Sequence, residues 1–307
     1  MIVVFGSLNV DVMIAVDHLP SPGETVLGPG YELTAGGKGA NQALAAARAG
    51  AKVAMIGSIG GDPLAETALK DLRAAGVDLS HLATVTDPTG LAAICVDKGG
   101  ENHVVVASGA NRRTKAAQFP EALLGPQTLL VLQMEVPHGE NWSLIRRAKE
   151  KGARILLNAA PAAPIPSDVL KLLDWLIVNE NEAKQIAAAF DIRTEDARMA
   201  ARALAKAGGV TVIVTLGAAG AAAFLGSGDS LSVGALAITP VDTVGAGDSF
   251  VGGFAAATDR GRDLADALRY ASVGGALACL HPGAQPSLPM LVAIEACLAD
   301  LPAVQSA

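Results

Sequence analysis

The second half of the chain alternates between short apolar runs and longer amphipathic stretches. Four runs have the length and composition of buried strands, at residues 129–134, 154–158, 175–178 and 210–215. Three stretches between them have helical length and periodicity, at residues 139–151, 180–190 and 195–207. Because strands that alternate with helices usually pair in parallel, this pattern predicts an α/β fold with a largely parallel sheet and helices on both faces.

The first third of the chain follows a different pattern. A buried strand is predicted at residues 2–5, but the strand-like runs after it do not alternate regularly with helices. These runs lie at roughly 11–16, 24–33, 91–96 and 103–107, and the last two flank a hairpin sequence. We expect them to form a small sheet apart from the main one, within a single domain of residues 1–307.

Polar side chains stand at the predicted carboxyl ends of strands, which is where open α/β sheets bind ligands. Glu135, Asn158 and Asn179 follow three strands of the second half, so they could face one crevice. Asn9 and Asp11 follow the first strand and would share a face of an extended chain. Structural alternatives remain, because Asn9 and Asp11 could form an Asx turn and Asn179 could cap a helix.

Residues 36–42, Gly-Gly-Lys-Gly-Ala-Asn-Gln, lead into a helix rich in alanine. They are not a Walker A loop, because Gly39 stands after Lys38 where Ser or Thr is needed. The glycines would let a ligand approach the backbone near Gly37, with Lys38 and Asn41 about one helical turn apart. Close packing of the helix on the sheet would explain the glycines but not the lysine.

Residues 242–250, Asp-Thr-Val-Gly-Ala-Gly-Asp-Ser-Phe, leave the backbone nearly bare before an apolar helix expected over 250–257. The N–H groups of Gly245, Ala246 and Gly247 would point at one spot, where the helix dipole also favours an anion. Asp248 would stand at this opening, where a carboxylate can act as a base beside a phosphate. The structural alternative is an aspartate that caps the helix.

Two further segments are predicted to be turns. The sequence Thr-Leu-Gly-Ala-Ala-Gly at 215–220 follows a strand, and it either cradles a ligand or turns a hairpin. The sequence His-Pro-Gly-Ala-Gln-Pro-Ser at 281–287 is expected to be a loop that contains no helix, because it holds two prolines.

Composition excludes several classes of function. A formal net charge of -7 and the lack of a basic run argue against nucleic acid as a partner. The three cysteines lie far apart and indicate neither a disulfide framework nor a zinc site, and the glycines at 57–61 lack the spacing of a dinucleotide site. No uncharged apolar run is long enough for a membrane helix and no basic leader precedes the first strand, so we expect a cytoplasmic protein without a membrane partner.

The motifs at 36–42 and 242–248 together resemble the two characteristic sequences of the PfkB (ribokinase-like) carbohydrate kinases. The resemblance covers nearly the whole chain, with matches in the same order at 6–11, 22–25, 109–111, 179–182, 215–217 and 283–287. It implies a ribokinase-like three-layer α/β/α fold in which the small sheet is a lid. One departure is Asn-Ala-Ala-Pro at 158–161, where many relatives have Asn-Pro-Ala-Pro.

The resemblance also implies a role for individual residues. Asp248 would be the base that takes the proton of the attacking sugar hydroxyl, beside an anion hole formed by Gly245, Ala246 and Gly247. The residues that would hold the sugar hydroxyls are Asn9, Asp11, Gly37, Lys38, Asn41 and Glu135.

The same resemblance implies sites for the nucleotide and for two cations. Asn179 and Glu182 would organise Mg²⁺ and phosphate, and the nucleotide would lie along Thr215, Gly217 and Gly220. An activating K⁺ ion would be bound by main-chain and side-chain oxygens of Asp242, Val244, Gly283 and Ser287.

The implied activity is ATP-dependent phosphorylation of the 5-hydroxyl of D-ribose, with the lid pairing with its copy in a homodimer. Another substrate of the family is an alternative: a nucleoside, fructose or 2-keto-3-deoxygluconate. A nucleoside needs apolar surface for its base, and the chain has only two Trp and two Tyr. A non-catalytic sugar-binding sensor would be a different class of protein, but it would have no use for Asp248.

Overall fold

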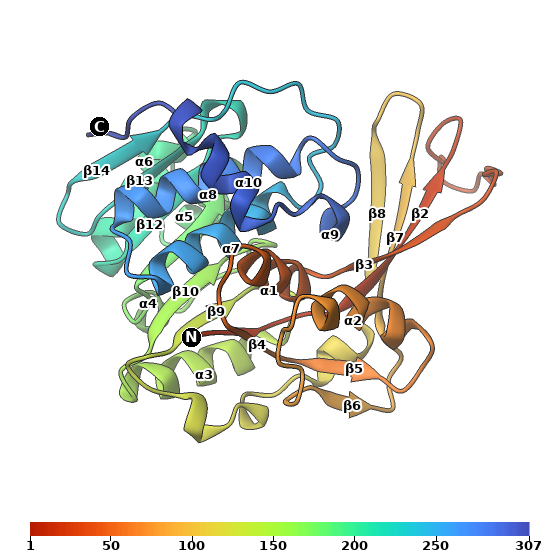
Figure 1. The fold of residues 1–307 in the computed structure, drawn as a ribbon, viewed down its shortest axis with the longest axis horizontal. Helices are drawn as coiled ribbons and strands as arrows, with labels where there is room; N and C mark the ends of the chain where they lie inside the picture. The colour runs from red at the N-terminus through yellow and green to blue at the C-terminus, as the bar shows by residue number, and fades with distance from the viewer. Residues whose placement is uncertain (307) are drawn as a thin grey trace.

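The computed structural model describes residues 1–306, and its centre is a nine-stranded sheet (Figure 1). The strands β4, β1, β9, β10, β11 and β12 pair in parallel, whereas β13, β14 and β15 continue the sheet antiparallel. In spatial order the strands are β15 (Gln305–Ser306), β14 (Ser230–Val233), β13 (Ala221–Phe224), β12 (Thr211–Thr215), β11 (Trp175–Asn179), β10 (Arg154–Asn158), β9 (Leu129–Leu132), β1 (Ile2–Phe5) and β4 (Val53–Ile56).

Helices cover both faces of this sheet because its strands are apolar on both sides. In β1, Ile2 and Val4 pack into one core, whereas Val3 and Phe5 pack into the other. The first core is covered by α1 (Lys38–Arg48), α2 (Leu64–Ala74), α7 (Ala246–Asp259), α8 (Leu264–Ala278) and α10 (Leu291–Cys297). The second is covered by α3 (His138–Glu150), α4 (Ser167–Leu170), α5 (Glu180–Ala189) and α6 (Ala197–Gly208). The three-layer α/β/α fold predicted from the sequence is therefore confirmed.

A second sheet stands out from this body as a lid (Figure 1). Its order is β3 (Glu32–Gly36), β2 (Asn9–Ala15), β7 (Gly90–Val96) and β8 (Asn102–Ala107). A separate parallel pair joins β5 (Ser58–Gly60) to β6 (Ala83–Val85), and 3-10 turns lie at Gly109–Arg113, Ala116–Gln118, Glu121–Leu123, Gly217–Ala219 and Leu298–Asp300. The lid strand β2 begins four residues after β1 ends, so the lid is joined directly to the edge where the central strands end.

Two predictions of local structure are wrong. The lid strand expected over 24–33 lies at Glu32–Gly36, and residues 24–31 precede it without strand structure. The loop expected to exclude helix at 281–287 contains the short helix α9 (Ala284–Ser287). Pro286 is in the first turn of α9, where a main-chain N–H would have no helical partner, so its missing N–H is tolerated.

Candidate active site

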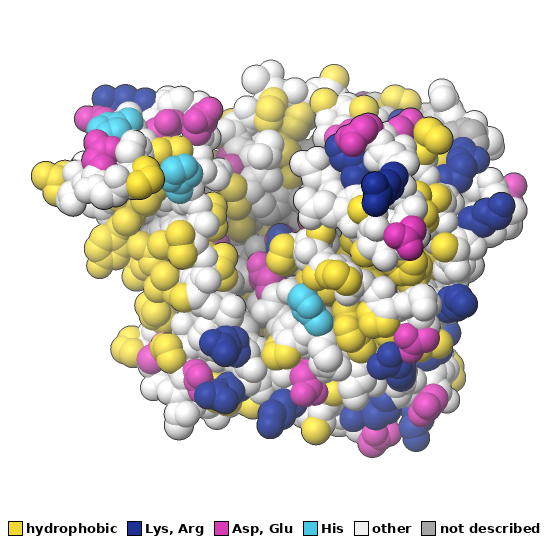
Figure 2. Space-filling view, turned by 180° about the vertical axis from the view of Figure 1, so that it is seen from behind, with side chains coloured by type: hydrophobic (Ala, Val, Ile, Leu, Met, Phe, Trp, Pro, Cys, Tyr) yellow, Lys and Arg dark blue, Asp and Glu magenta, His cyan; other side chains and the backbone are white. Residues whose placement is uncertain are grey.

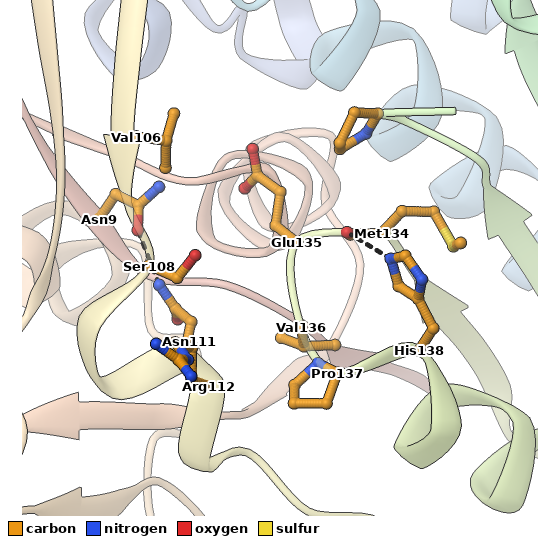
Figure 3. A pocket seen from close by; sticks show the side chains of 11 residues that line it. Asn9, Val106, Ser108, Asn111, Arg112, Met134, Glu135, Val136, Pro137 and His138 are labelled. Atoms are coloured by element: carbon orange, nitrogen blue, oxygen red, sulfur yellow. Dashed lines mark hydrogen bonds between the residues drawn. The ribbon is translucent and has the colours of Figure 1, made fainter. Parts of the chain in front are cut away.

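A cavity of about 720 Å³ lies between the lid and the body of the protein. In the surface view it is a hollow with acidic side chains in its wall (Figure 2). Asn9 and Val106 contribute from the lid, Glu135 from the segment between β9 and α3, and His138 from the first position of α3 (Figure 3). Of the residues expected to bind sugar, Asn9 and Glu135 line this cavity directly.

Asn9 is held so that its amide nitrogen is left for the cavity. Asn111 accepts a hydrogen bond from the main-chain N–H of Leu8 at 2.9 Å through Oδ1, which turns its Nδ2 toward Asn9. That Nδ2 donates to Asn9 Oδ1 at 2.7 Å and to the carbonyl of Leu8 at 3.1 Å. Because its oxygen already accepts from Asn111, Asn9 presents a donor to a ligand (Figure 3).

Glu135 is bound at the start of α1, and within residues 1–306 its second carboxylate oxygen makes no hydrogen bond. Its Oε2 accepts from Ser7 Oγ at 2.5 Å and from the main-chain N–H of Lys38 at 3.0 Å. Ser7 Oγ in turn accepts from the N–H of Gly39 at 3.2 Å. The helix N-terminus stabilises the negative charge, while the carboxylate is aimed into the cavity (Figure 3).

Asp11 lies two residues beyond Asn9 in β2 and packs against Gly36, the last residue of β3. A Cβ at Gly36 would lie 2.3 Å from Asp11 Oδ2, so only glycine leaves room for this carboxylate. Burial raises the pKa of Asp11 to about 6, the carboxylates of Glu135 and Asp248 act in the same direction, and Lys38 opposes them. The two acids of the sugar set therefore lie within electrostatic range of each other and of Asp248.

Lys38 lies within electrostatic range of all these acids. The Asp248 carboxylate is the main cause of its raised pKa, and Glu135, Glu182 and Asp11 also raise it, against the lowering effect of burial. Glu182 belongs to the expected nucleotide side, whereas Asp11 and Glu135 belong to the sugar side. Lys38 thus lies between the two sets and remains protonated.

Asp248 lies in the first turn of α7 and is buried, with 7% of its surface exposed. The helix begins at Ala246, so the cap is Gly245, at φ +80°, and the alternative in which Asp248 caps the helix is excluded. The N–H of Ala246 donates to the carbonyl of Thr243, but within residues 1–306 the N–H groups of Gly247 and Asp248 donate to no acceptor. Of the three residues predicted to form an anion hole, Gly245 is the cap and Ala246 has its N–H engaged by Thr243, so only Gly247 contributes to the free pair. The free N–H groups of Gly247 and Asp248, at the start of a 14-residue helix, form a geometry that can bind an anion.

Both oxygens of Asp248 accept hydrogen bonds from α1. Asn41 donates through Nδ2 to Oδ2 and Gln42 donates through Nε2 to Oδ1, each at 2.9 Å. The two motifs that are far apart in the sequence, 36–42 and 242–248, are therefore joined at this carboxylate. Gly37 caps α1 at φ +90°, and a Cβ there would lie 2.8 Å from the main-chain nitrogen of Asn9, so this position requires glycine.

The residues expected near the nucleotide lie at the carboxyl ends of β11 and β12. Asn179 pairs with Thr215 in the sheet register. The capping interpretation of Asn179 is confirmed, because its side chain accepts from the N–H of Glu182 at 2.9 Å and Glu182 Oε2 accepts from the N–H of Asn179 at 2.8 Å. The turn that holds Gly217 and Gly220 joins β12 to β13 in an antiparallel hairpin, as one of the two interpretations predicted.

The residues expected around a monovalent cation come together from two loops. Asp242 accepts from the N–H of Val244 at 3.0 Å and from the N–H of Gly283 at 2.8 Å, which joins the loops. A Cβ at Gly245 would lie 2.9 Å from the Cα of Ala284, so the backbones of the two segments are in close contact here. Ser287 is buried and donates to the carbonyl of Ala284 at 2.8 Å, which leaves its oxygen able to accept or to coordinate.

The donor set also bears on a divalent metal. No group of three or more His, Cys, Asp or Glu side chains that could hold a metal ion occurs in the part of the chain that the structure describes. Within residues 1–306 one carboxylate oxygen of Glu182 makes no hydrogen bond, and Lys38 and Asp248 lie within electrostatic range of this carboxylate. This set fits Mg²⁺, which commonly binds through one or two carboxylates together with substrate phosphates and water.

The pfkB family carbohydrate kinase model matches residues 1–291. The chain belongs to the pfkB family of carbohydrate kinases. A ribokinase of Haemophilus influenzae is 37% identical over 291 residues, which cover 93% of this chain and 94% of that protein. A deoxyribokinase of Salmonella typhi is 32% identical over 295 residues, which cover 94% of this chain and 96% of that protein.

Solved structures agree with this assignment. A ribokinase of Thermotoga maritima has a TM-score of 0.91 at 30% identity, over 97% of this chain and 99% of that chain. An Arabidopsis thaliana ribokinase complexed with ribose and ATP has a TM-score of 0.85 at 30% identity, over 97% of this chain and 98% of that chain. This pfkB kinase therefore shares its fold with ribokinases over nearly its whole length.

Several residues around the site were not predicted to be part of it. Asn111 and Ser7 orient Asn9 and Glu135, yet in the sequence they are only members of short motifs. Gln42 and Gln133 are fully buried beside the site. Gln133 follows the apolar run of β9, and a polar residue at this point of a buried strand was the signal that could have found it. Asn158 does not open onto the crevice expected for it but is 8% exposed and bonded to Gln42.

Proposed function

We propose that this kinase transfers the γ-phosphoryl group of ATP to the 5-hydroxyl of D-ribose. The observation that carries the proposal is the buried Asp248 carboxylate, which lies next to two free N–H groups and is joined to Asn41 on the sugar side of the site. The two ribokinase structures and the Haemophilus ribokinase support ribose as the acceptor. The Arabidopsis complex supports ATP as the donor.

In this mechanism Asp248 accepts the proton of the 5-hydroxyl as its oxygen attacks the γ-phosphorus. A carboxylate oxygen has two lone-pair sites, so one that accepts an amide N–H can still receive this proton. The bond from phosphorus to the β–γ bridging oxygen breaks as the new P–O bond forms, and ADP leaves. The free N–H groups of Gly247 and Asp248 would stabilise the charge on the transferring phosphoryl oxygens, which is the main requirement of phosphoryl transfer.

The remaining sugar hydroxyls would be held by donors and acceptors of both kinds. Asn9 offers an N–H donor, whereas Asp11 and the free oxygen of Glu135 offer acceptors. Asn41 and the backbone at Gly37 complete the set proposed for the sugar. Lys38, which lies between the sugar acids and Glu182, would neutralise the phosphates as they approach Asp248.

The nucleotide would lie over the carboxyl ends of β11 and β12, along Asn179, Thr215, Gly217 and Gly220. Mg²⁺ would arrive with ATP, and Glu182 would hold it directly or through water. When bound, this ion would neutralise charge on the β- and γ-phosphates.

K⁺ would be held between the loops joined by Asp242, through oxygens of Asp242, Val244, Gly283 and Ser287. The physical reason for activation is that this cation site would lie beside Gly245, at the start of α7, so an ordered cation would stabilise the anion hole. Replacing Na⁺ by K⁺ in the assay is expected to raise kcat. Equal rates in the two salts would remove the cation from the proposal.

We also propose a homodimer that forms through the lid. Its strand β8 is exposed along its length, including Val104, Val105 and Val106, and yellow side chains gather on the lid in Figure 2. Alternate residues of a strand point to opposite faces, so Val106 lines the sugar cavity while Val105 would be free to contact a second copy.

We also propose a cytoplasmic location. Within residues 1–306 no helix has the length and apolar character to cross a bilayer. All three cysteines are free thiols, as is usual in a reducing compartment.

The test is ADP formation from ATP, Mg²⁺ and K⁺ with a panel of acceptors: ribose, 2-deoxyribose, fructose, 2-keto-3-deoxygluconate, adenosine and inosine. The kcat/KM for ribose is expected to exceed the others. Asp248→Asn should bind sugar and ATP while kcat falls by at least about 10²-fold. Near-normal turnover in that variant would remove Asp248 as the base, and no turnover with any acceptor in the wild type would favour a sensor.

2-Deoxyribose is the second candidate, because the Salmonella relative is a deoxyribokinase. The two sugars differ by one hydroxyl, and a site that hydrogen-bonds this hydroxyl rejects the sugar that lacks it. A higher kcat/KM for 2-deoxyribose than for ribose would assign the second activity while leaving the roles of Asp248 and the anion hole intact.

A further inference from the structure

A chain of buried amide side chains leads from the central sheet to the Asp248 carboxylate. Gln42 donates through Nε2 to Asp248 Oδ1 and to Asn158 Oδ1, both at 2.9 Å. Its Oε1 accepts from Gln133 Nε2 at 2.6 Å. Gln42 and Gln133 are fully buried, so neither can touch a ligand, and the amide of Gln42 bonds to Gln133, Asn158 and the Asp248 carboxylate.

The direction of this chain is set by the main chain of the sheet. The carbonyl of Ile177 in β11 can only accept, and it receives Asn158 Nδ2 at 3.0 Å. Because Asn158 donates through Nδ2, its Oδ1 faces Gln42 as an acceptor. Gln42 therefore donates to this oxygen through Nε2. That same nitrogen bears the second N–H, which faces Asp248. An inverted Gln42 amide would place its oxygen against two acceptors, so its orientation is determined.

We propose that Gln42 is a positioning residue for the catalytic carboxylate and that Asn158 sets its orientation. The inference rests on the proposed role of Asp248 as the base. With Gln42 bonded to Oδ1 and Asn41 bonded to Oδ2, rotation of the carboxylate about its last side-chain torsion would break both bonds. A hydrogen bond to an ionised acceptor is about twice as strong as a neutral one, so the chain holds the base in one rotamer before the sugar arrives.

A purely structural role for the same amides predicts a different outcome. Every buried polar group that loses its hydrogen-bond partner destabilises the fold, whatever its place in the molecule. Thr128 provides the matched control, because it is 5% exposed and donates to the carbonyl of Leu123 at 2.6 Å, just before the opposite end of β9. A positioning role must lower kcat beyond what Thr128→Val does.

The experiment measures kcat, both KM values and Tm for Gln42→Met, Asn158→Leu, their double variant, Thr128→Val and Asp248→Asn. Gln42→Met keeps the length of the side chain and removes its N–H groups. Its kcat should fall about 10- to 100-fold, the scale of a displaced catalytic group, with both KM values within about threefold of wild type. Asn158→Leu should lower kcat less, and the double variant should be no slower than Gln42→Met, because the residues act in series.

Each outcome separates the inference from the proposed function. If Asp248→Asn is inactive while Gln42→Met has the kcat of wild type, or no lower than that of Thr128→Val, the positioning role is refuted alone. If Gln42→Met raises KM with kcat unchanged, the residue serves binding and the inference also fails. If Asp248→Asn has the kcat of wild type, both the role of Asp248 as the base and the positioning role of Gln42 are refuted. If Gln42→Met does not fold, Asn158→Leu is compared with Thr128→Val instead. A kcat of Asn158→Leu below that of Thr128→Val supports the positioning role, and a kcat no lower refutes it.

Discussion

Asp11→Asn should make the protein more stable at neutral pH, although it removes a group proposed to bind the sugar. The carboxylate of Asp11 is ionised at a cost, because burial, Glu135 and Asp248 all disfavour its charge and together raise its pKa to about 6. An uncharged amide of the same shape escapes this penalty. The position would then be an example of a functional residue that is retained at the expense of stability.

The size and sign of the effect follow from proton linkage. The pKa of Asp11 is about 6 in the folded protein against a model value of 3.8, so the folded state holds the proton more tightly than the unfolded state does. Ionisation therefore opposes folding, and the penalty grows as pH rises from 3.8 to about 6 and is constant above. It amounts to about 1.6 kcal/mol at pH 5 and about 3 kcal/mol at pH 7.

The assay is urea unfolding of the wild type and of Asp11→Asn at pH 5, 6, 7 and 8. The free energy of unfolding should be higher for the variant, with the difference about twice as large at pH 7 as at pH 5. Asp17→Asn is the control, because that carboxylate is 77% exposed and pairs with Lys98 at the surface, so it should change stability by less than about 1 kcal/mol. A difference that does not vary with pH, or a less stable Asp11→Asn at pH 8, would refute the reasoning.

Three further results are expected. The KM for ribose should rise about tenfold from pH 7 to pH 5 as Asp11 takes up its proton, and a KM constant over this range would show that the ionised form is not needed. Gly245→Ala should lower kcat at least about tenfold, because the residue is at φ +80° and lies against Ala284 of α9. Gly125→Ala is the control, because an added Cβ there meets open space and should not change kcat. Equal activities of the two variants would contradict the close contact at Gly245. Val105→Lys should convert the proposed dimer to a monomer in light scattering, whereas Val292→Lys, similarly exposed on α10, should not; a dimer that persists in Val105→Lys would exclude this face.

Much of the fold could be predicted from local pattern. The strands at 2–5 and 154–158 have the predicted bounds, because buried parallel strands are apolar on both faces and stand out from their surroundings. The prediction placed a lid strand at 24–33, whereas the strand lies at 32–36, because an edge strand of a lid is half exposed and its position depends on pairing with β2. The helix at 284–287 was missed because the first turn of a helix accepts a proline that its interior would not.

The sequence by itself determined which chemical groups this protein has: a bare turn before Asp248, a glycine-rich entry with Lys38 and Asn41, and acids at strand ends. These follow from residue type and spacing, which act over one or two turns of chain. Only the tertiary structure decided how these groups are oriented. The amide of Gln42 faces Asp248 because Asn158 is oriented by the carbonyl of Ile177 in β11, which lies 135 residues beyond Gln42 in the sequence. Hydrogen bonds between residues so far apart depend on the packing of α1 against the sheet, and no local pattern in the sequence contains that information.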